Sequence, residues 1–161
     1  MAFEVGQKCV VPQLGVGIVR SIDAMDLEGV EYRVYSVKIL ENGMEYYCPV
    51  DRAEAEGLRP LIPEEAIARV YDVLRDRDKP PDKQTWNRRY REYTAKIQTG
   101  DPMEVAAVLR DLSMLRQGKQ LSFGERRMYD KAHGLIVQEI SAARDVDEDK
   151  VSAELKALFE K

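Results

Sequence analysis

The chain has 161 residues, of which 44% are hydrophobic and 34% charged, and its formal net charge is −4. This is the composition of an ordinary globular protein with one domain or two small ones. No run approaches the roughly 18 apolar residues of a membrane span, and the N-terminal residues lack the basic and apolar regions of a signal peptide, so we expect a cytoplasmic protein.

Charge is divided unevenly along the chain. Residues 1–62 contain six Lys or Arg and ten Asp or Glu, a net charge of −4, whereas the remainder has 19 basic and 19 acidic residues. Within that remainder, positive charge gathers between Lys83 and Lys96, where five basic residues accompany one acidic residue. Local positive charge on an acidic protein favours an anionic partner such as the nucleic acid backbone.

Residues 1–60 have the patterns of short antiparallel strands. Gly15 and Gly17 indicate a strongly bent strand or a bulge, and Asn42 with Gly43 predicts a tight hairpin turn because both residues accept positive φ. Such strands fit a small SH3- or Tudor-like β-barrel, a fold that binds partners. Strands are expected at residues 8–11, 15–22, 30–40, 44–49 and 58–60.

The expected strand at 44–49 is unusually apolar and aromatic. Because side chains alternate along a strand, either Tyr46 and Cys48 or Tyr47 and Pro49 fill the barrel. The other pair faces outward and forms a strip for a protein partner, which could add a strand to this edge. The sequence alone leaves these two possibilities equal.

From Leu61 onward the hydrophobic period changes to 3.6, which indicates a compact bundle of about five helices. The expected domains are therefore residues 1–61, a β-barrel, and 62–161, a helical bundle, which together make an α+β fold. Phe123, at the start of a helix, is expected to be packed, and the alternative is that it helps to brace the Trp86 region. Helices are expected to start at Pro63, Thr85, Asp101, Ser122 and Asp147, with a capping box at 122–125.

Residues 83–91 hold the only tryptophan, Trp86, and a cluster of three arginines. An indole there could stack on bases or wedge between them. If the segment is a helix, however, Trp86 lies on an apolar stripe with Tyr90, which is more often core, and Arg88 and Arg91 lie on a solvated face. On periodicity alone both interpretations stay open.

The sequence contains no nucleophile elbow, no Walker A sequence and no acid–base pair with a defined partner, so we expect no enzyme activity. Cys9 and Cys48 form no C-x-x-C pair and no ligand cluster with His133, the lone histidine, so neither a metal nor a cofactor is expected. Both cysteines are interpreted as reduced, semi-buried apolar residues.

Eight segments in a fixed order resemble the CarD/CdnL family of bacterial transcription regulators over nearly the whole chain. Among them are Trp-Asn-Arg-Arg-Tyr at 86–90 and Leu-Ser-Phe-Gly-Glu-Arg-Arg-Met at 121–128. Each segment is weak alone, but the order and spacing are specific. The segments are residues 3–8, 15–17, 48–49, 57–59, 86–90, 100–101, 108–112 and 121–128.

The resemblance implies a regulator that binds the RNA polymerase β subunit through its Tudor-like domain and promoter DNA through its helical domain. The DNA contact would lie at the upstream edge of the melted −10 region, where Trp86 matches the family's wedge tryptophan in the minor groove and would stabilise the open complex. We expect a monomer that associates with the nucleoid through polymerase. The expected DNA-contacting residues are Trp86, Arg88, Arg89, Arg91 and Lys96.

In the barrel, Val37, Tyr47 and Pro49 match positions on the family's polymerase-facing surface. Some members carry arginine where this chain has Met25 and Tyr47, so an apolar, aromatic contact is expected here in place of a charged one. The alternative to this whole account is a protein–protein adaptor that never touches DNA, with Trp86 in the core of the bundle.

Overall fold

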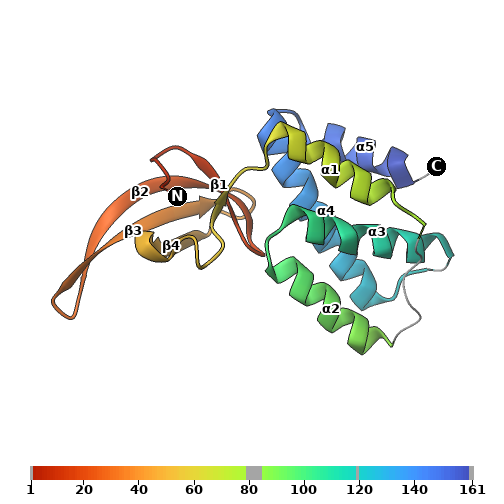
Figure 1. Ribbon diagram of the computed structural model, residues 1–161, viewed down its shortest axis with the longest axis horizontal. Coiled ribbons are helices and arrows are strands. Elements are labelled where there is room, and N and C mark those ends of the chain that lie inside the picture. Colours follow the sequence, from red (N-terminus) through yellow and green to blue (C-terminus); the bar gives the residue numbers. More distant parts are fainter. Residues whose placement is uncertain (1, 79–84, 119, 160–161) are drawn as a thin grey trace. The chain divides into compact units, whose positions relative to one another are not determined.

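The computed structural model describes residues 2–78, 85–118 and 120–159 (Figure 1). Lys83, which contributes to the expected basic cluster, lies outside the described residues. Contacts between residues divide the chain into two compact units, Met1–Leu61 and Ile62–Lys161. Within the described ranges, the first unit is a five-stranded antiparallel sheet and the second contains five α-helices. The expected α+β fold, a Tudor-like domain followed by a helical domain, is confirmed.

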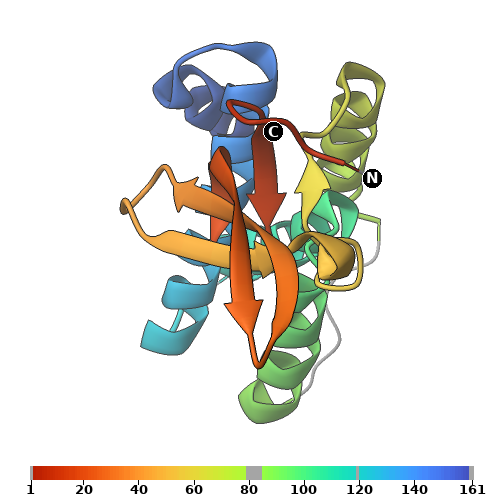
Figure 2. The same cartoon turned by 90° about the vertical axis from the view of Figure 1, so that its left-hand side faces the viewer.

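The sheet of the first unit is strongly curved (Figures 1 and 2) and has the strand order β4-β3-β2-β1-β5. Strand β2 continues to Leu27 instead of ending at Ile22, so β2 and β3 form a long two-stranded ribbon that reaches beyond their neighbours. One turn of 3₁₀ helix, Val50–Arg52, follows β4. The strands are β1 Lys8–Val11, β2 Gly15–Leu27, β3 Val30–Ile39, β4 Glu45–Pro49 and β5 Arg59–Pro60.

The loop at Asn42 and Gly43 connects β3 to β4 as expected, but it is not a two-residue turn. Only Gly43 has a positive φ, 74°, and its N–H donates to the Ile39 carbonyl at 2.8 Å. The Asn42 side chain accepts a hydrogen bond from the Met44 N–H at 2.9 Å. Asn42 therefore serves the loop through its side chain, and the backbone conformation expected of it is wrong.

The two-residue turn with both φ values positive lies instead between β2 and β3. Glu28 has φ 52° and Gly29 has φ 81°, and the flanking Leu27 and Val30 are paired directly. This is the backbone pattern of a type I′ turn, whose twist matches that of the strands it joins. A glutamate at the first position gave no signal for it, because non-glycine residues rarely adopt positive φ.

The core of the first unit lies on the inner face of the sheet, where Val37 and its alternate neighbours on β3 are buried. A Cβ atom at Gly17 would lie 2.5 Å from Val37 Cγ1, so this glycine lets two strands approach closely. The pairing of β2 with β3 shifts register between Val19 and Ser21, so the predicted bulge is present but lies beyond the glycines.

The two cysteines of the first unit are free and buried, which confirms their interpretation as small apolar core residues. Burial raises the pKa of the Cys9 thiol to about 11 and is the main reason why the pKa of Cys48 rises to about 12. Thiolate, the reactive form, is therefore scarce at neutral pH.

The second unit is a helical bundle around one apolar core, and the predicted helix starts are confirmed. The Thr85 Oγ1 accepts from the Arg88 N–H at 3.4 Å, and an Asp101 carboxylate oxygen accepts from the Met103 N–H at 2.9 Å. Ser122 begins the predicted capping box. The helices are α1 Glu64–Arg75, α2 Trp86–Gln98, α3 Pro102–Gly118, α4 Phe123–Arg144 and α5 Glu148–Phe159.

Candidate functional site

The structure decides which side of β4 faces the solvent. Cys48 is fully buried and Tyr46 packs partly against the core, while the Tyr46 hydroxyl donates to the exposed Glu56 at 2.7 Å. Burial, with this hydrogen bond, raises the Tyr46 pKa. Tyr47 alternates with them and is 61% exposed. Of the two possibilities left open by the sequence, Tyr47 and Pro49 are therefore the outward pair.

Three barrel residues selected by the family resemblance, Met25, Tyr47 and Pro49, lie on this outer face. The residues paired with them alternate along β3, and directly paired residues of antiparallel strands point to the same side of a sheet. The register therefore gathers side chains from three strands onto one surface. Their β3 partners are, respectively, Tyr32, Ser36 and Val34.

Val37 differs from the expectation, because it lies on the opposite face of β3. It is fully buried and pairs with Val19 on one side and Tyr46 on the other, both of which pack in the core. A fully buried side chain offers no area to a partner. We therefore assign Val37 to the support of the outer face and leave it out of the candidate surface.

A small polar network borders the outer face at the start of β4. The Glu45 carboxylate accepts from Arg20 Nη1 at 2.9 Å through one oxygen and from the Ser36 hydroxyl at 3.0 Å through the other. These three side chains come from three adjacent strands. The network therefore holds β4 in register beside Tyr47, which is two residues further along the same side of the strand.

Trp86 is the first residue of α2 and is half-buried. Its indole ring stands edge-on to the Tyr90 ring, with centroids 5.7 Å apart, and it also packs against the bundle core. A Cβ atom at Gly124 would lie 3.0 Å from the indole Nε1, so the ring rests against the backbone of the first turn of α4. The indole is thus partly open to solvent, and its inner side is supported by the backbone of α4.

Phe123, expected to be packed, is instead 77% exposed, because it is the first residue of α4 and projects from the helix end. The Arg127 guanidinium lies over its ring, 5.7 Å from the centroid. Gly124, the next residue, is the one that contacts Trp86. The expectation that Phe123 is packed is therefore wrong.

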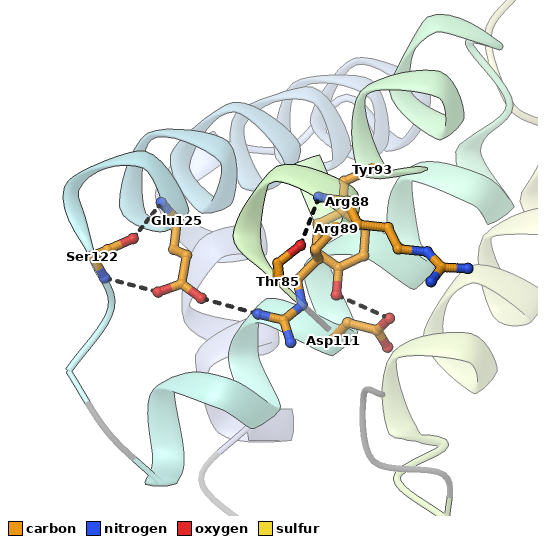
Figure 3. Close-up of polar contacts among 7 residues, drawn as sticks. All are labelled: Thr85, Arg88, Arg89, Tyr93, Asp111, Ser122 and Glu125. Carbon is orange, nitrogen blue, oxygen red and sulfur yellow. Dashed lines mark hydrogen bonds and ion pairs between the residues drawn. The ribbon is translucent and has the colours of Figure 1, made fainter. Parts of the chain in front are cut away.

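Arg89 also differs from the expectation. Its side chain is buried, 8% exposed for the whole residue, and its Nη1 lies 3.4 Å from a Glu125 carboxylate oxygen (Figure 3). The other Glu125 oxygen accepts from the Ser122 N–H at 2.9 Å, which closes the capping box of α4. Arg89 is therefore a structural link between α2 and α4, and we leave it out of the candidate DNA surface.

The other basic residues of α2 are less concentrated than the sequence suggested. Arg88 and Arg91 are exposed, but Arg88 Nε lies 3.9 Å from the Glu92 carboxylate, which partly offsets its charge. Lys96 is half-buried in the last turn of the helix. Ten residues of α-helix span about 15 Å, so Lys96 is too far from Trp86 to act at the same point.

His133 is half-buried on α4. Its ring stacks on Tyr129 with centroids 5.9 Å apart, and its Nε2 lies 3.4 Å from the Ser152 hydroxyl. Burial lowers its pKa, and nearby Asp130 opposes that change. Within the described ranges, His, Cys, Asp and Glu nowhere form a group of three or more suited to a metal ion. Likewise, no described helix has the length and hydropathy needed to cross a membrane.

Comparisons with known proteins match both units. The family described as CarD-like/TRCF RID domain matches residues 3–62, and the family described as CarD, C-terminal domain, matches residues 69–156. The chain is also 25% identical over 155 residues to the YdeB protein of Bacillus subtilis (strain 168), which is provisionally named a transcription factor. That alignment covers 94% of this chain and 98% of YdeB. The chain therefore belongs to the CarD/CdnL family of transcription regulators.

Proposed function

We propose that this protein binds RNA polymerase through the outer face of its first unit and stabilises the open promoter complex through Trp86. The observation that carries the proposal is the state of the indole, half-buried at a helix start and supported from below by Gly124. A wedge must expose part of its ring and resist being pushed back, and this arrangement supplies both properties. The exposed Tyr90 ring, which stands edge-on to the indole, widens the apolar area around it.

The DNA contact expected of such a surface is weak by itself. With Arg89 buried and Lys96 at the far end of α2, the basic side chains of α2 that remain exposed are Arg88 and Arg91. On α4, Arg127 lies over the Phe123 ring. Few phosphate contacts give weak binding, which weakens further as salt is added. A second attachment through the polymerase would raise the effective concentration of the patch at the promoter, so that the polymerase, and not base reading, selects the site.

The action requires no chemistry. Wedging an apolar side chain between base steps costs a few kcal/mol of unstacking, and a duplex already distorted at the edge of a melted bubble has lost part of that stacking. An indole at that edge would slow the reannealing of the strands. We therefore propose a non-catalytic regulator that acts with polymerase in the cytoplasm and needs neither a metal nor a cofactor.

The test is the lifetime of the open complex, followed after a competitor is added, with wild type and Trp86→Ala. We expect wild type to lengthen the lifetime and Trp86→Ala to lose most of that effect while still binding polymerase. Arg91→Ala should lose part of the effect, whereas Arg75→Ala, an exposed arginine on α1, serves as the matched control and should lose none. Equal lifetimes with wild type and Trp86→Ala would refute the wedge.

The partial burial of Trp86 favours a second candidate, an adaptor that binds only proteins and uses the indole for packing. The two functions differ in how the indole responds to DNA. On a polymerase–promoter complex, a wedge should transfer Trp86 from solvent to the stacked bases, which quenches its fluorescence and shields it from iodide. An adaptor would show the same fluorescence with and without promoter DNA.

A further inference from the structure

The distal half of the β2–β3 ribbon carries an apolar face that is open to solvent. Met25, Leu27, Val30 and Tyr32 are between 39% and 54% exposed. Met25 pairs with Tyr32 and Leu27 pairs with Val30, so all four side chains lie on one side of the ribbon. Single exposed apolar residues are common, but a contiguous group of this kind marks an interaction site.

The rest of the ribbon is acidic. Residues 22–33 contain four acidic residues and one basic residue, a net charge of −3. On the side opposite the apolar face, Asp26 is paired directly with Glu31, and Glu28 occupies the turn. Like charges placed directly opposite each other destabilise a strand pair. Folding gains nothing from the Asp26–Glu31 pair, whereas a nearby cation on a partner would relieve their repulsion.

We propose that this hairpin tip, defined as residues 25–32, inserts into an apolar recess of a partner protein rimmed by lysine or arginine. The inference rests on the proposed function, because the tip continues the outer face that carries Tyr47 and Pro49. The partner is therefore the same polymerase surface, and the tip extends the contact along the ribbon beyond the strand edge.

The geometry of the tip suits this role. The two-residue turn at Glu28 and Gly29 and the unbroken pairing from Ser21 to Leu27 hold the four apolar side chains in one arrangement. A surface that is ordered before binding loses less conformational entropy when it is bound. The apolar side chains supply affinity, and the acidic side chains speed association with a basic rim and make it sensitive to salt.

The test measures binding of the full chain to purified core RNA polymerase at several salt concentrations. The variants are Leu27→Ser combined with Val30→Ser at the tip, Tyr47→Ser on the adjoining face, and Leu40→Ser as a matched control that is also about half exposed in the first unit. We expect the tip variant to weaken binding about tenfold or more and Leu40→Ser to stay within about twofold, as for central and peripheral contacts.

A second pair of substitutions, Asp26→Asn with Glu31→Gln, separates binding from folding. Removing the like-charged pair should leave thermal stability unchanged or raise it, yet weaken binding and flatten its salt dependence. Tighter binding, or an unchanged salt dependence, would overturn the basic rim. If the tip variant binds polymerase like wild type while Tyr47→Ser binds more weakly, the proposed role of the tip is refuted and the proposed function is retained. If both variants bind like wild type, the role of the tip and the polymerase-binding role of the outer face are both refuted.

Discussion

The two units expose their candidate surfaces by different structural means. In the first unit, Tyr47 reaches solvent because it alternates with core residues along β4, and Met25 reaches solvent because the distal part of β2 is exposed on both faces. The register of the sheet decides which of these side chains share a face. In the second, Trp86 and Phe123 are each the first residue of a helix, directly after a capping residue. A sheet face is fixed by pairing along its whole length, whereas helix ends depend on a few local contacts.

If helix ends hold the second surface together, Glu125→Ala should have the largest effect, because it removes the partner of Arg89 and half of the capping box. Breaking a buried ion pair costs about 3–5 kcal/mol of unfolding free energy. Urea unfolding followed by Trp86 fluorescence measures this cost. The control is Glu92→Ala, at the exposed pair with Arg88, which should change stability by less than about 0.5 kcal/mol. Equal effects of the two substitutions would contradict the distinction.

A substitution at Gly17 tests whether the first unit depends on the close approach of its strands. Gly17→Ala places a Cβ atom 2.5 Å from Val37 Cγ1 and 3.1 Å from the Lys38 carbonyl oxygen, so we expect a loss of about 1–3 kcal/mol. Hydrogen exchange should show the loss in residues 1–61. Gly134→Ala, where the nearest atom would be 3.9 Å away, should instead stabilise α4 by up to about 1 kcal/mol. If Gly17→Ala left the free energy of unfolding unchanged, the sheet would tolerate a wider spacing of these strands.

The smallest expected effect is the pH dependence of stability. It concerns the second unit, which contains the lone histidine, His133. Burial lowers the His133 pKa, so the folded state favours the neutral ring. Its stabilising contribution is present above the unfolded pKa of about 6.5 and is lost as pH falls through the folded pKa. Hydrogen exchange of the second unit should be measured at pH 7.5 and 5.5. At pH 5.5 we expect weaker protection in wild type than in His133→Gln. Identical pH dependence would exclude this role for the ring.

Local signals in the sequence predicted most of the fold. The caps at Thr85, Asp101 and Ser122 involve residues two or three positions apart, so a short stretch of sequence is enough to predict them. The structure confirms all three caps. The turn at Glu28 was missed for the opposite reason. Its backbone conformation follows from the pairing of two long strands, and glutamate has no intrinsic preference for positive φ.

The candidate surfaces could be predicted only in part. Alternation could not place Val37, because β3 is buried on both faces from Val34 to Val37. Arg89 looked like its arginine neighbours, and its partner Glu125 is 36 residues away, a separation that no local pattern reveals. The apolar side of the ribbon emerged only once the register paired Met25 with Tyr32.

The contact between Trp86 and Gly124 has a consequence for how this surface can vary. Glycine favours a helix less than alanine does, by up to about 1 kcal/mol in a helix interior, and Gly124 lies in the first turn of α4, where a smaller gain is expected from a side chain. A methyl group there would come within 3.0–3.2 Å of three indole atoms and would have to displace the ring. The position of the indole on the bundle surface therefore depends on the absence of a side chain at position 124 of another helix. One substitution at that position would change how far the indole is exposed.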